Sequence, residues 1–467
     1  MANGTYDVAI IGSGPGGYTS AFRASKLGLK TALIEKDDKL GGTCLHVGCI
    51  PTKALLFQAE IYDYIQRASE FGIEVSGVKL NWPKIIERKR EVVKKHAQGL
   101  AMLAKKNKVD VHTGFGRLAG GGVIEVDAGK GKKEQVKAKH IILATGSAAR
   151  LFPGLEDDGE RILTNVSVME LKAVPKSMIV IGSGAVGVEF ASIYKTFGTD
   201  VTVLEMLPRV VPNEDEEISA ELEKHLKKRG IRVETNAKFE ASKKDSKGVT
   251  VTFTKDGKKQ DVAAETLLVA VGRRPMTEGI GLEKTKAKVE RGYIHTNEWM
   301  ETAEPGLYAI GDIVAGMPWL AHAAMWQGMV VVGKLAGKPM PPVRKDRIPM
   351  VTFCEPQIGS IGLSEALAKE KGHKVKVGKF PFVGNSKASI VGAHGGFVKV
   401  VADEKYGEIL GVHIIGPNAT EIIAEATTAL QLEATVDDLM AMVHAHPTLW
   451  EAMADGVNAV RGLTINI

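Results

Sequence analysis

The stretch Gly12-Ser13-Gly14-Pro15-Gly16-Gly17 decides the fold because of what surrounds it. The short apolar run Tyr6–Ile11 comes directly before it, and a helix-like stretch follows. A second strand-like run, Thr31–Ile34, then ends at Glu35, which stands 23 positions after Gly12. A strand, a glycine-rich turn, a helix and a strand that ends in an acidic residue are typical of a βαβ dinucleotide-binding unit.

The same arrangement occurs a second time. Ser177–Ile181 is again an apolar run, and Gly182-Ser183-Gly184-Ala185-Val186-Gly187 follows it. The next strand-like run, Val201–Leu204, ends at Glu205, again 23 positions after the first glycine. One G-x-G-x-x-G motif is a weak signal, since many glycine-rich turns fit it, but here strand, helix and acidic residue agree in both copies. We therefore expect the chain to bind two dinucleotides.

Each position of the motif has a physical reason. The first glycine permits the tight turn, the second lets the backbone approach a pyrophosphate, and the third allows close packing of helix on strand. The helix N-terminus faces the phosphates, and the terminal carboxylate can bind the adenosine ribose hydroxyls. These residues are Gly12, Gly14, Gly17 and Glu35 in the first copy, and Gly182, Gly184, Gly187 and Glu205 in the second.

Composition narrows the class of protein. At 467 residues the chain exceeds what one hydrophobic core usually organises, so we expect more than one domain. Three cysteines are too few for a disulfide framework and indicate a reducing compartment. No apolar run approaches the ~18 residues of a membrane span, and the first strand-like segment, near Tyr6, leaves no room for a signal peptide. A cytoplasmic protein without membrane contact is expected, and a processed organellar chain would look similar.

The net charge of +6 is modest for this length. The basic stretch Arg88-Lys89-Arg90, with Lys94 and Lys95, lies in a helix-like run without any nucleic-acid motif. We interpret it as a solvated helix face and expect no nucleic-acid partner.

A further strand-like run that ends in a turn follows each of the two βαβ motifs. Ile141–Leu143 leads into the turn Thr145-Gly146-Ser147, and Leu267–Val271 leads into Gly272 in the same way. A third run ends in a turn that carries Asp312. After residue 344 the rhythm changes to strands and helices of another kind, which predicts a separate α+β domain. Its expected elements are the strands Gly396–Val401 and Glu408–Ile415 and the helices Glu421–Leu430 and Val436–Val443.

Cys44 and Cys49 are separated by four residues. Two structural thiols are the plainest interpretation of such a pair. A zinc site would need about four ligands, and only His46 is near, so no metal is expected. A redox-active disulfide fits best, because the helix-like Ala54-Leu55-Leu56 places the pair near a helix N-terminus, which favours the reactive thiolate.

His446 and Glu451 stand on either side of a predicted helix start. Pro447 is a natural first helical residue, which would put His446 at the lip of the helix and Glu451 one turn in. A histidine oriented by a carboxylate can act as general base and acid. From the spacing alone, a capping or surface histidine beside an ordinary helical glutamate is favoured.

Taken together, these segments resemble the pyridine-nucleotide–disulfide oxidoreductases from about Tyr6 to Glu451. Within that family, the cysteine segment looks most like that of the dihydrolipoyl dehydrogenases, with the residues Gly41-Gly42-Thr43-Cys44-Leu45-His46-Val47-Gly48-Cys49-Ile50-Pro51-Thr52-Lys53-Ala54-Leu55-Leu56. The resemblance implies an α/β protein with two Rossmann-like domains, for FAD and NAD, and a C-terminal α+β dimerisation domain. The boundaries expected are 1–148 and 273–345 for the two parts of the FAD-binding domain, 149–272 for the NAD-binding domain, and 346–467 for the dimerisation domain.

The resemblance also implies residue roles. Cys49 would face the flavin, Cys44 would exchange with substrate, and Lys53 would lie beside the flavin, paired with Glu189. His446 and Glu451 would form a proton relay that acts across a homodimer, with His446 reaching the partner subunit's Cys44. The remaining cofactor contacts implied are Asp312 at the FAD ribitol, and Thr145, Gly146, Ser147, Ala321, His322 and Gly272.

The function implied is the oxidation of protein-bound dihydrolipoamide with reduction of NAD, in partnership with the lipoyl domain and acyltransferase core of a 2-oxo-acid dehydrogenase complex. A glutathione-type reductase would use NADPH, and Glu205 would repel its 2′-phosphate. A non-catalytic NADH-binding protein on the same fold is the alternative of another class, against which the two cysteines and His446 argue.

Two segments depart from the family pattern. The run Ala323-Ala324-Met325-Trp326 lacks the Lys and acidic residues that usually follow Ala-His. Cys354 and Gln357 stand where Thr and Glu are usual, and Cys354 is predicted to be a small buried residue. None of these positions carries the electron path, so they bear on subfamily and partner rather than on reaction type.

Overall fold

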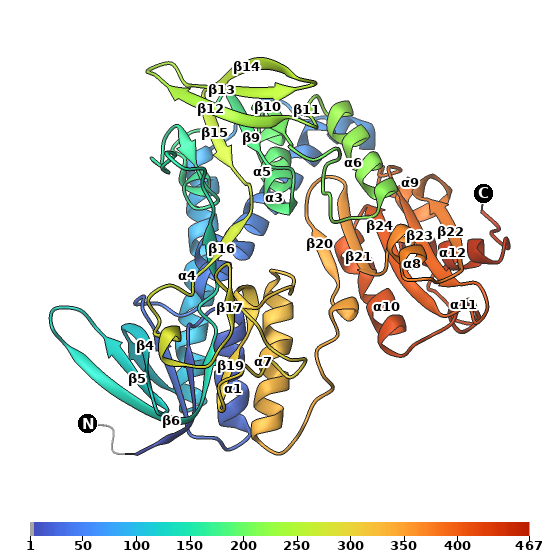
Figure 1. The fold of residues 1–467 in the computed structure, drawn as a ribbon. Helices are drawn as coiled ribbons and strands as arrows, with labels where there is room; N and C mark the ends of the chain where they lie inside the picture. Colours follow the sequence, from blue (N-terminus) through green and yellow to red (C-terminus); the bar gives the residue numbers. More distant parts are fainter. Residues whose placement is uncertain (1–3, 467) are drawn as a thin grey trace. The chain divides into compact units, whose positions relative to one another are not determined.

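The computed structural model, drawn in Figure 1, describes residues 4–466. These residues form two compact units. The first unit comprises residues 4–54, 84–150 and 273–345, and the second comprises residues 55–83, 151–272 and 346–466. Each unit contains one of the two glycine-rich turns.

A seven-stranded sheet in the order β3-β2-β1-β6-β5-β4, with β19 also paired to β6, forms the centre of the first unit. Its strands are β1 (Tyr6–Ile11), β2 (Thr31–Glu35), β3 (Asp110–Thr113), β4 (Phe115–Gly120), β5 (Val123–Asp127), β6 (Lys133–Leu143) and β19 (Leu307–Ala309). β3, β2, β1, β6 and β19 run parallel, whereas β5 is antiparallel to both of its neighbours, β4 and β6. Because parallel strands end at one edge, the turns after β1, β6 and β19 meet there.

Helices α1 (Pro15–Lys26) and α7 (Ala321–Leu335) pack side by side in this unit. Small residues make this packing possible, since a Cβ on Gly328 would overlap the hydroxyl of Ser20. The short helix α2 (Gly42–Val47) belongs to the same unit, while α3 (Cys49–Gln66) and α4 (Trp82–Lys106) contribute residues to both units.

The basic run on α4 is not wholly solvated. Arg88 and Arg90 are exposed, but Lys89 is only 2% exposed, so the expected solvated face is wrong for that residue. Lys89 lies three positions after buried Ile86, and this helical spacing puts both on the buried side of α4.

The nucleotide-binding part of the second unit is a parallel sheet in the order β11-β10-β9-β15-β8. Its strands are β8 (Ile162–Leu163), β9 (Ser177–Ile181), β10 (Asp200–Leu204), β11 (Arg232–Glu234) and β15 (Thr266–Val269), with helices α5 (Ala185–Thr196) and α6 (Glu216–Lys228). A three-stranded antiparallel sheet accompanies it, formed by β12 (Lys238–Lys244), β13 (Val249–Lys255) and β14 (Lys258–Ala264).

The C-terminal part is an antiparallel sheet in the order β20-β21-β24-β23-β22. The strands are β20 (Met350–Thr352), β21 (Gln357–Gly362), β22 (Val375–Pro381), β23 (Phe397–Asp403) and β24 (Ile409–Gly416). The helices are α8 (Glu365–Glu370), α9 (Ser386–Ile390), α10 (Ala419–Gln431), α11 (Val436–Met440) and α12 (Glu451–Val460). The helix expected over Val436–Val443 therefore ends three residues earlier, where Met442 N donates to the Leu439 carbonyl in a tightened final turn.

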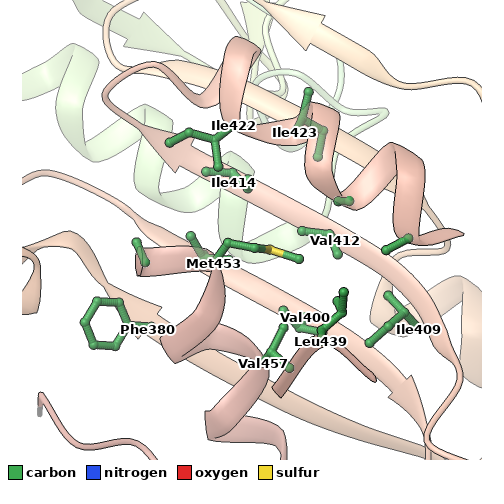
Figure 2. Close-up of a cluster of buried hydrophobic side chains, with 14 of the residues drawn as sticks. Phe380, Val400, Ile409, Val412, Ile414, Ile422, Ile423, Leu439, Met453 and Val457 are labelled. Atoms are coloured by element: carbon green, nitrogen blue, oxygen red, sulfur yellow. The ribbon is translucent and has the colours of Figure 1, made fainter. Parts of the chain in front are cut away.

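One face of this sheet carries the hydrophobic core shown in Figure 2. Alternate residues of the central strands, such as Val400 on β23 and Val412 on β24, point to the same side, where they meet Ile422 of α10 and Met453 of α12. Burial of this apolar surface is the main force that holds the C-terminal part together.

The opposite face of the same sheet carries charge. Lys399 on β23 is 3% exposed, and its Nζ lies 3.0 Å from Asp215, 2.7 Å from Glu217 and 3.0 Å from Glu365. Asp215 is also the N-cap of α6, since its carboxylate accepts a hydrogen bond from Glu217 N. The buried ammonium group thus ties the start of α6 to the C-terminal sheet, and loss of one partner would leave an unpaired buried charge.

A buried carboxyl group beside this cluster makes folding stability depend on pH. Burial raises the pKa of Glu214 from 4.5 to about 7, although Ser360 Oγ donates a hydrogen bond to it at 2.7 Å. The folded state therefore holds this proton more tightly than the unfolded state. Its stabilising contribution is complete below pH ~4.5 and is lost as the pH rises through ~7.

We predict that the free energy of unfolding of Glu214→Gln, measured by urea denaturation, exceeds that of the wild type by roughly 2–3 kcal/mol at pH 8. At pH 5 the two proteins should differ little. The reason is that Gln carries no charge to desolvate above pH 7. Glu216→Gln, at an exposed neighbouring position, is the control and should change little at either pH. Equal pH dependence of the wild type and Glu214→Gln would contradict the prediction.

Candidate active site

The first glycine-rich turn has the shape that a phosphate group requires. Gly12 has φ +102°, and the third glycine, Gly17, is so close to the turn that a Cβ would overlap the Gly12 carbonyl oxygen. At Gly14, the N-cap of α1, a Cβ would meet no atom within 4 Å. The backbone at Gly14 is therefore open to a ligand at the N-terminus of α1.

The second turn repeats this geometry closely. Gly182 has φ +98°, and a Cβ on Gly187 would overlap the Gly182 carbonyl oxygen. Gly184, the N-cap of α5, is again open, with no atom within 4 Å of an added Cβ. The N-termini of α1 and α5 therefore have the same backbone geometry, which suits the binding of a pyrophosphate group.

The two acidic residues are held by the same contacts in each copy. Glu35 Oε2 accepts hydrogen bonds from Ser13 N at 2.8 Å and Ser13 Oγ at 2.5 Å. Glu205 Oε2 accepts them from Ser183 N at 2.8 Å and Ser183 Oγ at 2.7 Å. Each carboxylate is thus fixed beside its own glycine-rich turn, at the place where a ribose would bind.

The turns at the carboxyl edge of the first sheet meet as expected. The hydroxyl of Ser147 donates to Asp312, and Arg273 donates from Nε to Ser147 Oγ at 2.6 Å. Thr145 Oγ1 donates to the Met276 carbonyl at 2.6 Å, and Gly146 accepts from Met276 N at 2.9 Å. The first unit therefore brings Asp312 together with residues 145–147.

Arg273 is a site residue that the sequence reasoning missed. It directly follows Gly272, which has φ +100°, and it is the first residue of β16 (Arg273–Pro275), which pairs with β7 (Ser147–Ala149). Its Nε also lies 3.9 Å from Asp312. The only sequence signal for it was the strand-then-glycine pattern that ends at Gly272.

The cysteine segment packs on the first glycine-rich turn. Gly41 N donates to the Ser13 carbonyl at 3.0 Å, and a Cβ on Gly42 would lie 2.8 Å from Gly14 Cα. Cys44 lies within α2, and Cys49 is the first residue of α3. The cysteines therefore follow directly on a segment that is fixed to the phosphate-binding turn.

Cys44 and Cys49 are both half-buried. Their hydrogen bond, together with burial, raises the pKa of Cys44 well above its usual range. Cys44 therefore keeps its proton at neutral pH. Cys354, in contrast, is 1% exposed, as predicted for a small buried residue.

One pairing that the resemblance implies involves residues of different units. Lys53 lies in the first turn of α3 and belongs to the first unit, whereas Glu189 on α5 belongs to the second. Glu189 is 4% exposed and accepts a hydrogen bond from Phe353 N at 2.9 Å. The pairing of Lys53 with Glu189 stays a prediction.

Ala321 and His322 are the first two residues of α7. Further along this helix, Gln327 accepts a hydrogen bond from Gly311 N at 2.6 Å. Because Asp312 follows Gly311, α7 helps to position the turn that carries this carboxylate.

His446 and Glu451 do form a hydrogen-bonded pair, with Nδ1 and Oε1 2.8 Å apart. The expected helix start at Pro447 is wrong, because α12 begins at Glu451. Thr448 N donates to Glu451 Oε2 at 2.8 Å and its hydroxyl donates to the Ala445 carbonyl, so residues 445–450 form a turn instead. Burial favours a higher pKa for Glu451, but the hydrogen bonds from Thr448 and His446 outweigh it and lower that pKa.

The imidazole of His446 is 70% exposed and is oriented by a carboxylate that is mostly covered. A second pair of the same kind lies two residues away, where His444 Nε2 is 2.9 Å from Glu425 Oε1 on α10. Within residues 4–466, no group of His, Cys, Asp and Glu is arranged to hold a metal ion. The same residues include no helix that is long and apolar enough to cross a membrane.

The comparisons with known proteins agree with this geometry. Residues 6–328 match the family described as pyridine nucleotide-disulphide oxidoreductase, and residues 348–456 match the dimerisation domain of that family. The chain belongs to the pyridine nucleotide-disulphide oxidoreductases. This confirms the family resemblance and the α/β fold class with a C-terminal dimerisation domain.

Two relatives named dihydrolipoyl dehydrogenase are similar over the whole chain. The protein from Bacillus subtilis is 45% identical over 99% of both chains, and the one from Rhizobium etli is 43% identical over 99% of both chains. Among solved structures, LpdA from Mycobacterium tuberculosis matches with a TM-score of 0.90 and 28% identity, covering 98% of this chain and 99% of its own.

Alanine substitutions at Gly184 and Gly187 make a matched pair of variants, because an added Cβ meets no atom at Gly184 but overlaps the backbone at Gly187. Gly184→Ala should fold like the wild type, because its φ of −65° suits any residue and its Cβ meets nothing, but it should bind NADH at least ~10-fold more weakly. Gly187→Ala should lose roughly 2 kcal/mol or more of stability, because its Cβ overlaps a backbone oxygen. Urea unfolding and NADH titration measure the two effects.

The bound flavin serves as the internal control for this pair, since it reports on the first turn. Gly184→Ala should keep its flavin absorbance. Wild-type NADH affinity in Gly184→Ala would show that the pyrophosphate does not approach this turn.

Proposed function

We propose that the protein is a dihydrolipoyl dehydrogenase, which oxidises dihydrolipoamide to lipoamide and reduces NAD to NADH. The observation that carries this proposal is the packing of the cysteine segment on the first glycine-rich turn, through Gly41 and Gly42. A dithiol fixed to a dinucleotide-binding turn, in a chain with a second such turn, can pass an electron pair between two cofactors. The names of the full-length relatives support the same reaction.

The chain's own residues fit both cofactors. The open N-cap at Gly14, the carboxylate of Glu35 and the cluster around Ser147 and Asp312 would hold FAD in the first unit. Thr145, Gly146, Ala321, His322 and Gly272 are the further contacts that we propose for the cofactors. When bound, FAD supplies the redox chemistry between the dithiol and NAD.

The second turn would hold NAD rather than NADP. Its carboxylate, Glu205, is 7% exposed and already accepts two hydrogen bonds from Ser183. A 2′-phosphate at the adenosine ribose would bring a second negative charge next to this fixed carboxylate. This selectivity argues against a glutathione-type reductase.

Thiol–disulfide exchange is the step that the cysteines perform. In the oxidised enzyme, a substrate thiolate attacks the Cys44 sulfur, so that a substrate–Cys44 bond forms and the Cys44–Cys49 bond breaks, leaving Cys49 as a thiolate. The second substrate thiol attacks the mixed disulfide at the substrate sulfur and releases lipoamide and the Cys44 thiol. The substrate loses two electrons and two protons, and the cysteine pair gains the two electrons.

The positions of the two thiols suit this division. Cys49 opens α3, and the partial positive charge at that helix N-terminus stabilises its thiolate. Cys44, whose pKa is raised by its hydrogen bond to Cys49, holds the proton in the reduced pair. We therefore assign substrate exchange to Cys44 and the contact with the flavin to Cys49, with Lys53 and Glu189 as supporting charges beside it.

His446 would remove the proton from the substrate thiol. Glu451 accepts the Nδ1 hydrogen of the imidazole, which leaves Nε2 unprotonated and free to act as a base. The family's dimerisation domain spans residues 348–456 and includes this pair. We propose that the exposed His446 of one protomer serves the partner subunit's Cys44 in a homodimer.

The protein partner proposed is the lipoyl domain on the acyltransferase core of a 2-oxo-acid dehydrogenase complex. A cytoplasmic location is also proposed, on the ground that three cysteines in 467 residues suit a reducing compartment.

A steady-state assay tests the function directly. With free dihydrolipoamide, the purified protein should reduce NAD, and it should show little activity with NADPH and glutathione disulfide. Greater activity with the second pair would make the protein a glutathione-type reductase. No turnover with either pair, despite bound flavin and NADH affinity, would support the non-catalytic NADH-binding alternative.

Serine variants should separate the two cysteines. In Cys44→Ser, the remaining Cys49 thiolate lies beside oxidised FAD, so a long-wavelength absorption band should appear without any reductant. In Cys49→Ser this band should be absent. Both variants should lose dihydrolipoamide oxidation but keep most NADH oxidation by a one-electron dye, which needs only the flavin. A band in Cys49→Ser instead would reverse the assignment.

Removal of the base should be selective for the thiol substrate. His446→Gln should lower dihydrolipoamide oxidation by at least ~100-fold while dye reduction is kept, and Glu451→Ala should cost less because it orients the base without taking the proton. His444→Gln, in the neighbouring pair with Glu425, is the matched control and should cost much less than His446→Gln. Unimpaired activity in His446→Gln would return that histidine to a capping role.

A further inference from the structure

A cavity of about 700 Å³ lies along the groove between α1 and α7 in the first unit. Thr19, Arg23 and Leu27 line it from α1, and His322, Met325 and Trp326 are among the residues that line it from α7. Its volume is within the range of about 300–1,000 Å³ that small-molecule sites occupy.

The shape of this groove follows from the packing of the two helices. Their backbones approach closely at Gly16 and Gly328, and the segment after α7 then folds back over its last turn, with Lys338 N donating to the Gly333 carbonyl at 2.8 Å. Glycine is needed at Gly333, because a Cβ would lie 2.7 Å from the Lys338 carbonyl oxygen. The segment 338–340, which also lines the groove, is therefore anchored to α7.

The lining is apolar, mainly through Leu27, Met325, Trp326, Met329 and Met340. Methionine and tryptophan are side chains that adapt to irregular apolar ligands. Two of these residues, Met325 and Trp326, belong to the run in which the chain departs from its family, since Lys and acidic residues usually follow Ala-His there. The reaction proposed above uses neither of them.

The charge around the groove has one sign. Arg23 and Lys338 line it, and no aspartate or glutamate does. Both cations are exposed, and neither forms an ion pair with a carboxylate among residues 4–466. Two cations without partners, beside a long apolar lining, complement a molecule with an apolar body and an anionic end.

We propose that this groove binds a small amphipathic anion, of the class of medium-chain or aromatic carboxylates, with its apolar body against Met325, Trp326 and Met329 and its carboxylate at Arg23 or Lys338. A helix of a protein partner is a poorer match, because a cylinder about 10 Å wide would fill the cavity within about six residues. The proposal does not rest on the proposed function, and none of the lining residues except His322 is a proposed cofactor contact.

Decanoate is the probe for this site. Titration calorimetry of the FAD-loaded enzyme, saturated with NAD to fill the second turn, should show saturable binding of one decanoate per chain. Hexanoate should bind at least tenfold more weakly, since each buried methylene contributes about fourfold in affinity. Decyltrimethylammonium, which has the same chain with a positive end, should also bind at least tenfold more weakly.

Variants place the binding in the groove. Arg23→Gln should weaken decanoate binding by up to about fivefold, as expected for an exposed ion pair, and Arg23→Glu should weaken it further. Lys26→Gln is the matched control, because Lys26 is exposed on the same helix but does not line the groove. Trp326→Ala should weaken binding at least tenfold, and all four variants should keep dihydrolipoamide oxidation.

Three results would overturn the proposal. One is the absence of saturable binding below the micelle concentration of decanoate. Another is equal decanoate affinity in the wild type, Arg23→Glu and Trp326→Ala. The third is dissociation of the dimer by decanoate, measured by sedimentation, since a second copy of the chain would then be the occupant of the groove.

Discussion

The close contact between the third glycine of each turn and the first is the constraint on which the rest of the molecule depends. Because Gly17 has no Cβ, the start of α1 lies directly against the carbonyl oxygen of Gly12, and Gly187 brings α5 against Gly182 in the same way. This contact aims each helix N-terminus at one open position, Gly14 or Gly184. A methyl group at the third position would displace the helix and with it the anion site.

The chemistry of the first unit is built outward from that contact. Ser13 follows Gly12 and holds both the Glu35 carboxylate and the backbone of Gly41. Gly41 in turn opens the segment that carries Cys44 and Cys49. A short chain of hydrogen bonds therefore fixes the Glu35 carboxylate, the glycine-rich turn and the cysteine segment relative to one another. Such preorganisation is what an oxidoreductase contributes to its cofactors.

The second unit contains two sheets, the parallel sheet with the second glycine-rich turn and the antiparallel sheet of the dimerisation domain. Its C-terminal sheet buries an apolar face under α10 and α12 and presents charge on the other face, where Lys399 meets Asp215 at the start of α6. A buried ion cluster adds less stability than apolar packing would, but it accepts only one arrangement of its partners. Asp215 stands at the end of the segment that follows β10 and Glu205, so this contact joins that segment to the C-terminal sheet.

Much of this protein was determined by the sequence alone. The two glycine-rich turns, the acidic residues 23 positions later, the cysteine pair and the separate C-terminal domain are local patterns whose spacing follows from helix and strand geometry. The resemblance in these motifs named the family correctly. Local reasoning failed at Pro447, where the side chain of Glu451 and not the proline decides the helix start, and at Lys89, whose burial depends on packing around α4. Only the tertiary structure revealed the contacts of Arg273 with Ser147 and of Lys399 with Asp215, which join residues 126 and 184 positions apart. Contacts between residues so far apart in the chain produce no periodic pattern in the sequence.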